Sequence, residues 1–330
     1  MAHGDVVEQR WEHLRALIRR LALAWPMVGL PGALAGCSCP DVDQVYLLRQ
    51  PDDTTRALLD ACEDPARHDC QPLCEHVAGL SGPAGLVGQI THCELHKPNG
   101  DYAEVHIRWA SSCPGGRRPE GLVLAPSATA GAGALFAQVA QLEAASVPAF
   151  ERLASELRAH GAPPALAVEA TRARADERRH ARVVTALARR FGAAVPRLQV
   201  RQERYVRSLE AVAIENAVEG CVRETYGALV ATHQAACAAD PIVRLAMTTI
   251  AADETKHAAL ACVVDEWARS RLSAAAHRRV AGARGEACES LAHDVERAIP
   301  AAVASLAGLP DAGAARRLAR AVGSFATEAA

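Results

Sequence analysis

Two short segments of the chain repeat the same spacing of residues that can bind a metal ion. Glu177 and His180 lie three positions apart in the hexapeptide ADERRH, and Glu254 and His257 have the same spacing in ADETKH. Residues three positions apart on a helix share a face, so each carboxylate can act with its imidazole on the same ion. One such pair is common by chance on a charged helix. Two copies in register favour a site with internal two-fold symmetry.

A lone glutamate precedes each pair along the chain. Glu143 in QLEAASVPAF aligns with Glu219 in AVEGCVRETY at a shift of 76 positions, and the two Glu-x-x-His pairs align at a shift of 77. The repeat therefore predicts two related helical hairpins that meet at one site. We expect six metal ligands, namely Glu143, Glu177, His180, Glu219, Glu254 and His257.

The ligand types indicate which cations would fit. Four buried carboxylates would be costly if they were left unpaired, and two divalent cations would balance their charge. Oxygen and imidazole ligands without thiolate suit iron or manganese. We therefore expect two iron ions as cofactors, with manganese or a mixed iron–manganese pair as the alternative, while zinc is compatible with the same ligands.

The third expected helix offers more than one glutamate. Glu215 lies one turn from Glu219 on the same face, so we expect it to support the site or to add a ligand. Glu224 lies about 140° around an α-helix from Glu219 and aligns with Pro148 in the first hairpin. Glu219 is our choice of ligand, and whether Glu215 or Glu224 joins it stays open. Pro148 predicts a kink or a π-bulge five residues after Glu143.

An aromatic residue follows each lone glutamate by seven positions, Phe150 in the first hairpin and Tyr226 in the second. Seven residues are about two helical turns, so Tyr226 shares a face with Glu219. A buried tyrosine at that place could hydrogen-bond a ligand or carry a radical. The alternative is an ordinary core position.

Helical patterns follow one another from Ala134 almost to the end of the chain, with Pro and Gly at the breaks. The long helices are each about 45 Å in length at 1.5 Å per residue, which suits a four-helix bundle. We expect helices at about 132–160, 164–191, 198–238 and 241–270, and shorter ones at about 273–298 and 311–325. The domain limits that follow are a linker at 126–133, a bundle at 134–270 and accessory C-terminal helices at 271–330.

Residues 37–125 have a different character, with strand-like runs at 45–50, 90–96 and 102–109. Asn99-Gly100 between the last two predicts a hairpin turn. After Cys37 this segment holds Cys39, Cys62, Cys70, Cys74, Cys93 and Cys113. An even number of cysteines predicts an α+β domain stapled by up to three disulfides. A zinc site that includes Cys70 and Cys74 with nearby histidines is the alternative.

Residues 1–36 read as a secretory signal. Arg15, Arg19 and Arg20 precede LALAWPMVGLPGALAG, a stretch of 16 uncharged residues that ends next to Cys37. Such a stretch is shorter than the roughly 20 apolar residues of a spanning helix. The sequence Leu-Ala-Gly-Cys resembles a bacterial lipobox, which implies acylation of Cys37. We expect a lipoprotein of the periplasm or outer membrane, anchored in the membrane at Cys37. A buried N-terminal helix is the alternative.

Composition narrows the class of protein further. The chain has 330 residues, half of them apolar, and a formal net charge of −2. This length can bury a sizeable core, and the scarcity of aromatic residues, 4%, favours long helices. No basic block is present to follow a phosphate backbone, so we expect no nucleic-acid partner.

The segment from Asp176 to His180, DERRH, resembles the motif of the ferritin-like superfamily in its di-iron carboxylate members. The second copy, from Asp253 to His257, differs by Lys for Arg. The resemblance covers about 132–270 and implies a four-helix fold around two irons. It also implies crossed hydrogen bonds, from His257 to Asp176 and from His180 to Asp253. The layout with a cysteine-rich N-terminal segment is similar to that of ferritin-like lipoproteins of proteobacteria.

The resemblance implies an oxidoreductase whose site reacts with dioxygen, peroxide or a small-molecule substrate, as a ferroxidase, peroxidase or oxygenase does. The alternative function is a non-enzymatic metal-binding, structural or interaction lipoprotein. A homodimer is compatible with either function. The substrate and the electron donor do not follow from the sequence.

Overall fold

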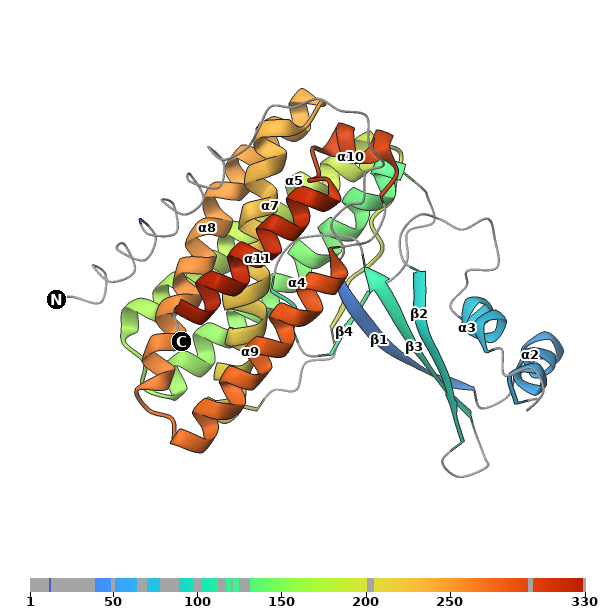
Figure 1. Cartoon of the computed structure of the whole chain (residues 1–330), viewed down its shortest axis with the longest axis horizontal. Coiled ribbons are helices and arrows are strands. Elements are labelled where there is room, and N and C mark those ends of the chain that lie inside the picture. The colour runs from blue at the N-terminus through green and yellow to red at the C-terminus, as the bar shows by residue number, and fades with distance from the viewer. Residues whose placement is uncertain are drawn as a thin grey trace.

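The computed structural model gives a mainly helical protein with a small strand-containing region near the N-terminus (Figure 1). It describes residues 12, 39–48, 51–63, 70–77, 89–97, 103–111, 117–119, 121–124, 131–200, 205–295 and 299–328. The expected signal segment 1–36, apart from residue 12, lies outside these residues, as do Cys37 and Cys113. Among the described helices, none is both long and apolar enough to cross a membrane.

The N-terminal region contains a three-stranded antiparallel sheet. Its strands β1 (Cys39–Leu48), β2 (Gln89–His96) and β3 (Ala103–Ser111) are ordered β1-β3-β2. The expected hairpin is confirmed as the β2–β3 pair, in which Cys93 is opposite Ile107. Helices α2 (Asp53–Glu63) and α3 (Gln71–Val77) lie beside the sheet (Figure 1) and share a small apolar core with it.

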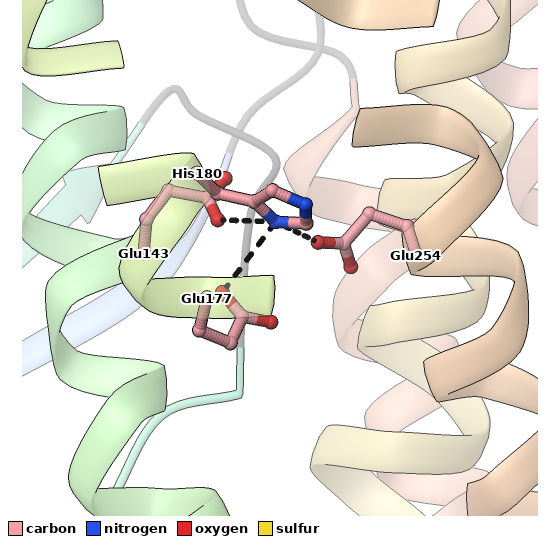
Figure 2. A group of neighbouring side chains, drawn as sticks. All are labelled: Glu143, Glu177, His180 and Glu254. Atoms are coloured by element: carbon pink, nitrogen blue, oxygen red, sulfur yellow. Dashed lines mark ion pairs between the residues drawn. The ribbon is translucent and has the colours of Figure 1, made fainter. Parts of the chain in front are cut away.

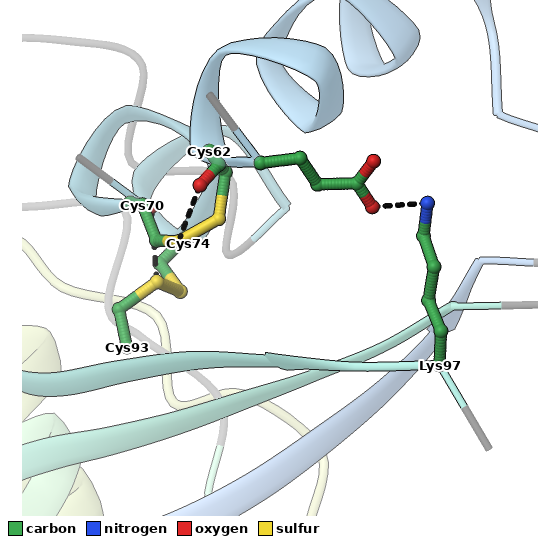
Figure 3. Close-up of a disulfide and its surroundings, with 6 residues drawn as sticks. Cys62, Cys70, Cys74, Cys93 and Lys97 are labelled. Carbon is green, nitrogen blue, oxygen red and sulfur yellow. Dashed lines mark hydrogen bonds and ion pairs between the residues drawn. A yellow bond between two sulfur atoms is a disulfide. The ribbon is translucent and has the colours of Figure 1, made fainter. Parts of the chain in front are cut away.

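Two disulfides staple this region, as Figure 3 shows. Cys62 is bonded to Cys70 and joins α2 to the start of α3, while Cys74 is bonded to Cys93 and joins α3 to β2. Both cysteines of the alternative zinc site are therefore in disulfides and have no thiolate to bind zinc. That alternative is wrong. Disulfides of this kind persist in an oxidising environment, so the N-terminal region points to an extracytoplasmic location.

The long helices largely follow the expected limits. They are α4 (Gly131–Ala159), α5 (Pro164–Arg190) and α8 (Pro241–Arg269). Helix α5 packs on α4 and on α8. Helix α4 begins inside the segment that we expected to be a linker, and Gly131 at its start has a positive φ of 74°.

The third long helix departs from the expectation in two ways. It starts at Leu209, later than expected, because Ser208 caps it by accepting a hydrogen bond from the Ala211 N–H. The preceding β5 (Gln199–Val200) pairs instead with β4 (Leu122–Val123). The helix then runs as three pieces in sequence, α6 (Leu209–Glu215), η1 (Asn216–Glu224) and α7 (Thr225–Cys237), which pack along α8.

The middle piece, η1, is a π-helix of 9 residues. We expected such a distortion at Pro148, but α4 stays α-helical through that residue. The proline removes one N–H donor and its ring crowds the carbonyl four residues earlier, yet no π-helical turn forms in α4. The distortion lies in the other half of the repeat, at the residues that align with the neighbourhood of Pro148.

The C-terminal helices are α9 (Ala274–Asp294), α10 (Ala301–Ala307) and α11 (Ala312–Glu328). Helix α10 was not expected, and Gly308 ends it with a left-handed φ of 66°. Leu291 of α9 and Leu318 of α11 belong to the same apolar core as Leu142 of α4. The helices after residue 271 therefore complete the core of the long helices.

Candidate metal centre

Three of the long helices bring five of the expected ligands together. Glu143 comes from α4, Glu177 and His180 from α5, and Glu254 and His257 from α8. Each side chain belongs to a residue that is at most 2% exposed. Three carboxylates in one solvent-free place require a counter-charge, so this group of five residues is the candidate functional site.

His180 lies at the centre of the group (Figure 2). Its Nδ1 is 3.3 Å from Glu143 Oε2, 3.2 Å from Glu254 Oε1 and 3.8 Å from Glu177 Oε2. One ligand atom from each of these residues falls within 4.8 Å of all the others. The four side chains converge from three helices on a space that a single cation could occupy.

His257 has the corresponding position on α8. Its Nδ1 lies 3.1 Å from Glu177 Oε1 and 3.8 Å from Glu254 Oε1. Each histidine thus approaches most closely a glutamate of the other Glu-x-x-His pair, and Glu177 and Glu254 lie between the two rings. The ring centroids of His180 and His257 are 6.0 Å apart.

The other nitrogen of each ring faces an aspartate from the opposite helix. His180 Nε2 is 3.3 Å from Asp253 Oδ2, and His257 Nε2 is 3.5 Å from Asp176 Oδ2. This is the crossed arrangement that the family resemblance implied. Arg179 Nη2 donates to both aspartates, at 2.8 Å to Asp176 and 2.7 Å to Asp253. The aspartates are therefore held in place on their outer side as well.

The buried ligand atoms fit a bound cation. Within the described part of the chain, the following atoms of the site lack a hydrogen-bond partner: Glu143 Oε2, His180 Nδ1, both ring nitrogens of His257 and both carboxylate oxygens of Glu177 and Glu254. A buried polar atom without a partner is destabilising. Several such atoms that converge on one place are satisfied together by a metal ion, and the acceptor Asp253 at His180 Nε2 favours the tautomer of His180 with Nδ1 free to coordinate.

The charges of the centre shift the pKa values of its members. Burial, together with Glu254 and Glu143, raises the pKa of Glu177 well above its ordinary value. Burial also disfavours the charged form of Glu254, but attraction to His180 and His257 outweighs it and lowers its pKa to about 2.

The histidines respond in the opposite sense. Burial disfavours a charged His180, yet Asp253, Glu143 and Glu254 together raise its pKa to about 12. Burial is likewise outweighed at His257, whose pKa lies well above the ordinary value because of Asp176, Glu177 and Glu254. Protons on the imidazoles are thus the counter-charge that a metal cation would replace.

Glu219 does not join this group. Its Oε2 accepts a hydrogen bond from the Arg118 N–H at 3.1 Å, and its Oε1 pairs with Arg223 at 3.0 Å. It lines an open surface cleft of about 710 Å³ together with Glu215. Glu215 in turn pairs with Arg207. Glu215 at the end of α6 and Glu219 on η1 thus face this cleft, and neither belongs to the group around His180.

Glu224 takes the inward position on η1. It is 1% exposed, and its charge interacts with those of His257 and Glu254. Burial raises the pKa of its carboxyl to about 7, against the effect of Arg117. We preferred Glu219 on the geometry of an α-helix and left the part of Glu224 open, but in a π-helix residues five apart are hydrogen-bonded across one turn. The π-helix thus turns Glu224 toward a side that it would not face in an α-helix.

Tyr226 is buried, at 3% exposure, in the apolar core with Leu142 and Val222. A small cavity of about 20 Å³ lies beside two of the proposed ligands, and Tyr226 does not line it. Glu143 and Glu254 line it together with apolar side chains such as Phe136 of α4. A cavity with this accessible volume holds about one molecule of the size of water.

No family model, curated protein or solved structure matches the chain. The residues of the site and the helices that position them are therefore the basis on which a function can be inferred.

Proposed function

We propose that the chain is a ferritin-like metalloprotein in which α4, α5, α6–η1–α7 and α8 form a four-helix bundle around a dinuclear metal centre. The observation that carries the proposal is the orientation of the two buried imidazoles. Each presents Nδ1 to the carboxylates and Nε2 to an aspartate of the other helix, at 3.3 Å for His180 and 3.5 Å for His257. Metal ligation accounts for this orientation, because a coordinating imidazole turns one nitrogen to the metal and the other to a hydrogen-bond acceptor.

The contacts divide the ligands between two positions. Glu143 and His180 would hold the first cation, because Oε2 and Nδ1 are 3.3 Å apart. His257 would hold the second. Glu177 and Glu254 would be shared, because each has an oxygen within 3.8 Å of both Nδ1 atoms. Glu224 is the remaining carboxylate that points toward the second position, in place of Glu219.

The donor set favours two iron ions, or manganese in one or both positions, since it consists of oxygen and imidazole without thiolate. Such ions supply electrons to an oxidant that binds next to them. The protein contributes the rest: buried helices exclude bulk water, the glutamates balance the charge, and Asp176 and Asp253 orient the imidazoles. We therefore propose an oxidoreductase.

The cavity beside Glu143 and Glu254 indicates the size of the reacting molecule. Its volume of about 20 Å³ and its largely apolar lining beside the two glutamates suit a small molecule such as dioxygen or peroxide. We propose a ferroxidase or peroxidase in preference to an oxygenase. A purely structural metal site, the alternative, gives no reason for a cavity that opens on two ligands.

The proposed reaction is tested by stopped-flow mixing. The protein, loaded anaerobically with about two ferrous ions per chain, is mixed with oxygen or with hydrogen peroxide while ferric absorbance is followed. We expect rapid oxidation by one of the two, abolished in E143Q and retained in E151Q. Glu151 is a matched control because it lies on the same helix but is exposed. Equal rates in both variants would contradict the assignment, and no reaction with either oxidant would leave the structural alternative.

We also propose that the protein is an exported lipoprotein. The disulfides Cys62–Cys70 and Cys74–Cys93 support export, and the lipobox-like sequence before Cys37 supports a membrane anchor. Replacement C37S should move the protein from the membrane fraction to the soluble fraction. Unchanged fractionation would contradict acylation at that residue.

A further inference from the structure

Arg117 reaches the candidate metal centre from outside the long helices. It belongs to the short segment 117–119 ahead of β4, yet its side chain is only 1% exposed. Its carbonyl accepts a hydrogen bond from Ser146 Oγ of α4 at 3.1 Å, and its Nη2 donates to Asn216 Oδ1 of η1 at 2.8 Å. Asn216 donates in turn to the Ala261 carbonyl of α8 at 2.8 Å. The guanidinium is thereby fixed between α4, η1 and α8.

Two further residues shape the place that this guanidinium occupies. Gly220 of η1 makes room, because a Cβ at that position would lie 2.5 Å from Arg117 Nη2. Phe150 of α4 separates the guanidinium from the centre: its ring centroid is 5.3 Å from Arg117 Cζ and 5.1 Å from the His257 ring. Arg117 is therefore one aromatic ring away from a proposed ligand.

Arg117 is also the charge partner of the fourth inward carboxylate. Its Nε lies 3.6 Å from Glu224 Oε1, and its Nη1 lies 3.8 Å from Glu215 Oε1. These are ion-pair distances that are too long for hydrogen bonds. Both carboxylate oxygens of Glu224 lack a hydrogen-bond partner in the described structure. Glu224 thus pairs with the guanidinium, and its charge also interacts with those of His257 and Glu254.

The two ends of the centre are unequal as a result. At the first end, Glu143 lies 3.3 Å from His180 Nδ1. At the second end, among the residues that the structure describes, only Glu177 and Glu254 form ion pairs with His257 Nδ1. The carboxylate that corresponds to Glu143 in function, Glu224, is directed to Arg117 instead.

We propose that Arg117 is a positioning residue that makes the two metal positions unequal in affinity. The first cation binds among ligands that already converge. The second binds only when Glu224 exchanges the guanidinium for the metal, so the buried ion pair weakens that step. This inference rests on the proposed metal centre and concerns the order and strength of binding, which the centre alone does not determine.

Titration of the metal-free protein with Co²⁺, followed by calorimetry and by the visible absorption of the bound ion, tests the inference. In the wild type we expect two ions per chain, the second bound at least about tenfold more weakly, because it competes with a desolvated ion pair. R117Q should bring the two affinities to within about threefold of each other. R117K, which keeps the charge on a shorter side chain, should give an intermediate ratio. E224Q should lose the second ion and keep the first.

R118Q is the matched control, since Arg118 is the next residue and contacts Glu219 through its backbone N–H; it should leave the ratio unchanged. Circular dichroism shows whether R117Q is folded, and E224Q tests the same inference if it is not. Two ions of equal affinity in the wild type, or a second ion retained in E224Q, would overturn the role of Arg117 while the metal centre stands. Absence of any bound Co²⁺ would instead overturn the metal centre itself.

Discussion

Asp253 Oδ2 of α8 lies 3.3 Å from His180 Nε2 of α5. Asp253 directly precedes the proposed ligand Glu254. The pair joins the two copies of the repeat, because the aspartate of one copy orients the histidine of the other. Asp176 and His257 make the reciprocal pair at 3.5 Å. A centre built in this way depends on both aspartates, although neither would touch a metal.

Replacement D253N should therefore weaken metal binding without unfolding the protein. An asparagine keeps the size of the side chain but can present an N–H to Nε2, which disfavours the tautomer that leaves Nδ1 free. We expect a loss of about 10- to 100-fold in metal affinity, measured by competition with a chelator. K256Q is the control, because Lys256 Nζ contacts Asp253 Oδ1 at 3.0 Å from the outside. An equal loss in K256Q would show that the surface charge, rather than the contact with His180, determines the metal affinity.

Glu177 should limit the stability of the metal-free protein. Its carboxylate is fully buried beside Glu143 and Glu254, which raises its pKa, so a neutral side chain of the same shape relieves repulsion. We expect E177Q to raise the Tm of the metal-free protein by a few degrees, about 2–4 °C for each kcal/mol gained. The same variant should lose the rise in Tm that metal gives the wild type. A lower Tm of metal-free E177Q would show that the carboxylate is well compensated.

The metal-free protein should lose stability as the pH rises above about 6.5. The pKa of His180 is raised to about 12 in the folded state. At a pH above the pKa of the unfolded state, the folded protein therefore still holds a proton that the unfolded protein has released. The stability that this proton contributes is fully present below the pKa of the unfolded state. It is lost as the pH rises toward the pKa of the folded state. Metal competes with the same proton, so metal affinity should rise over this range.

Thermal unfolding of metal-depleted and Co²⁺-loaded protein between pH 6 and pH 9 measures both trends. We expect the Tm of the metal-depleted form to fall with rising pH and the difference between the two forms to widen. Parallel curves would show that protons and metal do not share the site.

Gly220 should be essential for the packing of η1. A Cβ there would lie 2.6 Å from Ala261 Cβ as well as against the Arg117 guanidinium, so G220A should destabilise the fold by about 1–3 kcal/mol. Gly282 is a matched control on α9, because a Cβ at that position has no neighbour within 4 Å. G282A should be neutral or should stabilise the helix by up to about 1 kcal/mol. Chemical denaturation distinguishes the two, and equal effects would contradict the close contact at Gly220.

The disulfides should stabilise the N-terminal region alone. Cys62 and Cys74 belong to a small core with Leu73 and Val105 that is separate from the core of the long helices. Replacement of Cys74 and Cys93 by serine should destabilise this region by about 2–5 kcal/mol and thereby unfold it. Metal binding should stay intact. Limited proteolysis with metal analysis checks this, and loss of bound metal would show that the two regions are coupled.

The internal repeat made most of the centre predictable. Glu177 and His180 share a face because of their spacing, the same holds for Glu254 and His257, and alignment of the halves added Glu143. Helix limits near Pro164 and Pro241 followed from the position of the prolines. These inferences need only helical geometry and the order of residues, which the sequence carries.

The third helix could not be predicted in the same way. Alignment selected Glu219 because it assumes that both halves are α-helical, whereas η1 is a π-helix in which Glu224 faces inward. Arg117 is held in its buried position by Asn216, which lies 99 residues further along the chain. A long-range contact of this kind leaves no local pattern, although Gly220 in the middle of a helix was a sign of close approach by another group.

Anomalous diffraction from crystals loaded with Mn²⁺ or Co²⁺ tests the central claim most directly, because it locates the ions. We predict two peaks, one between Glu143 and His180 and one next to His257, with Glu177 and Glu254 between them. The absence of any peak among these side chains at saturating metal would contradict the account.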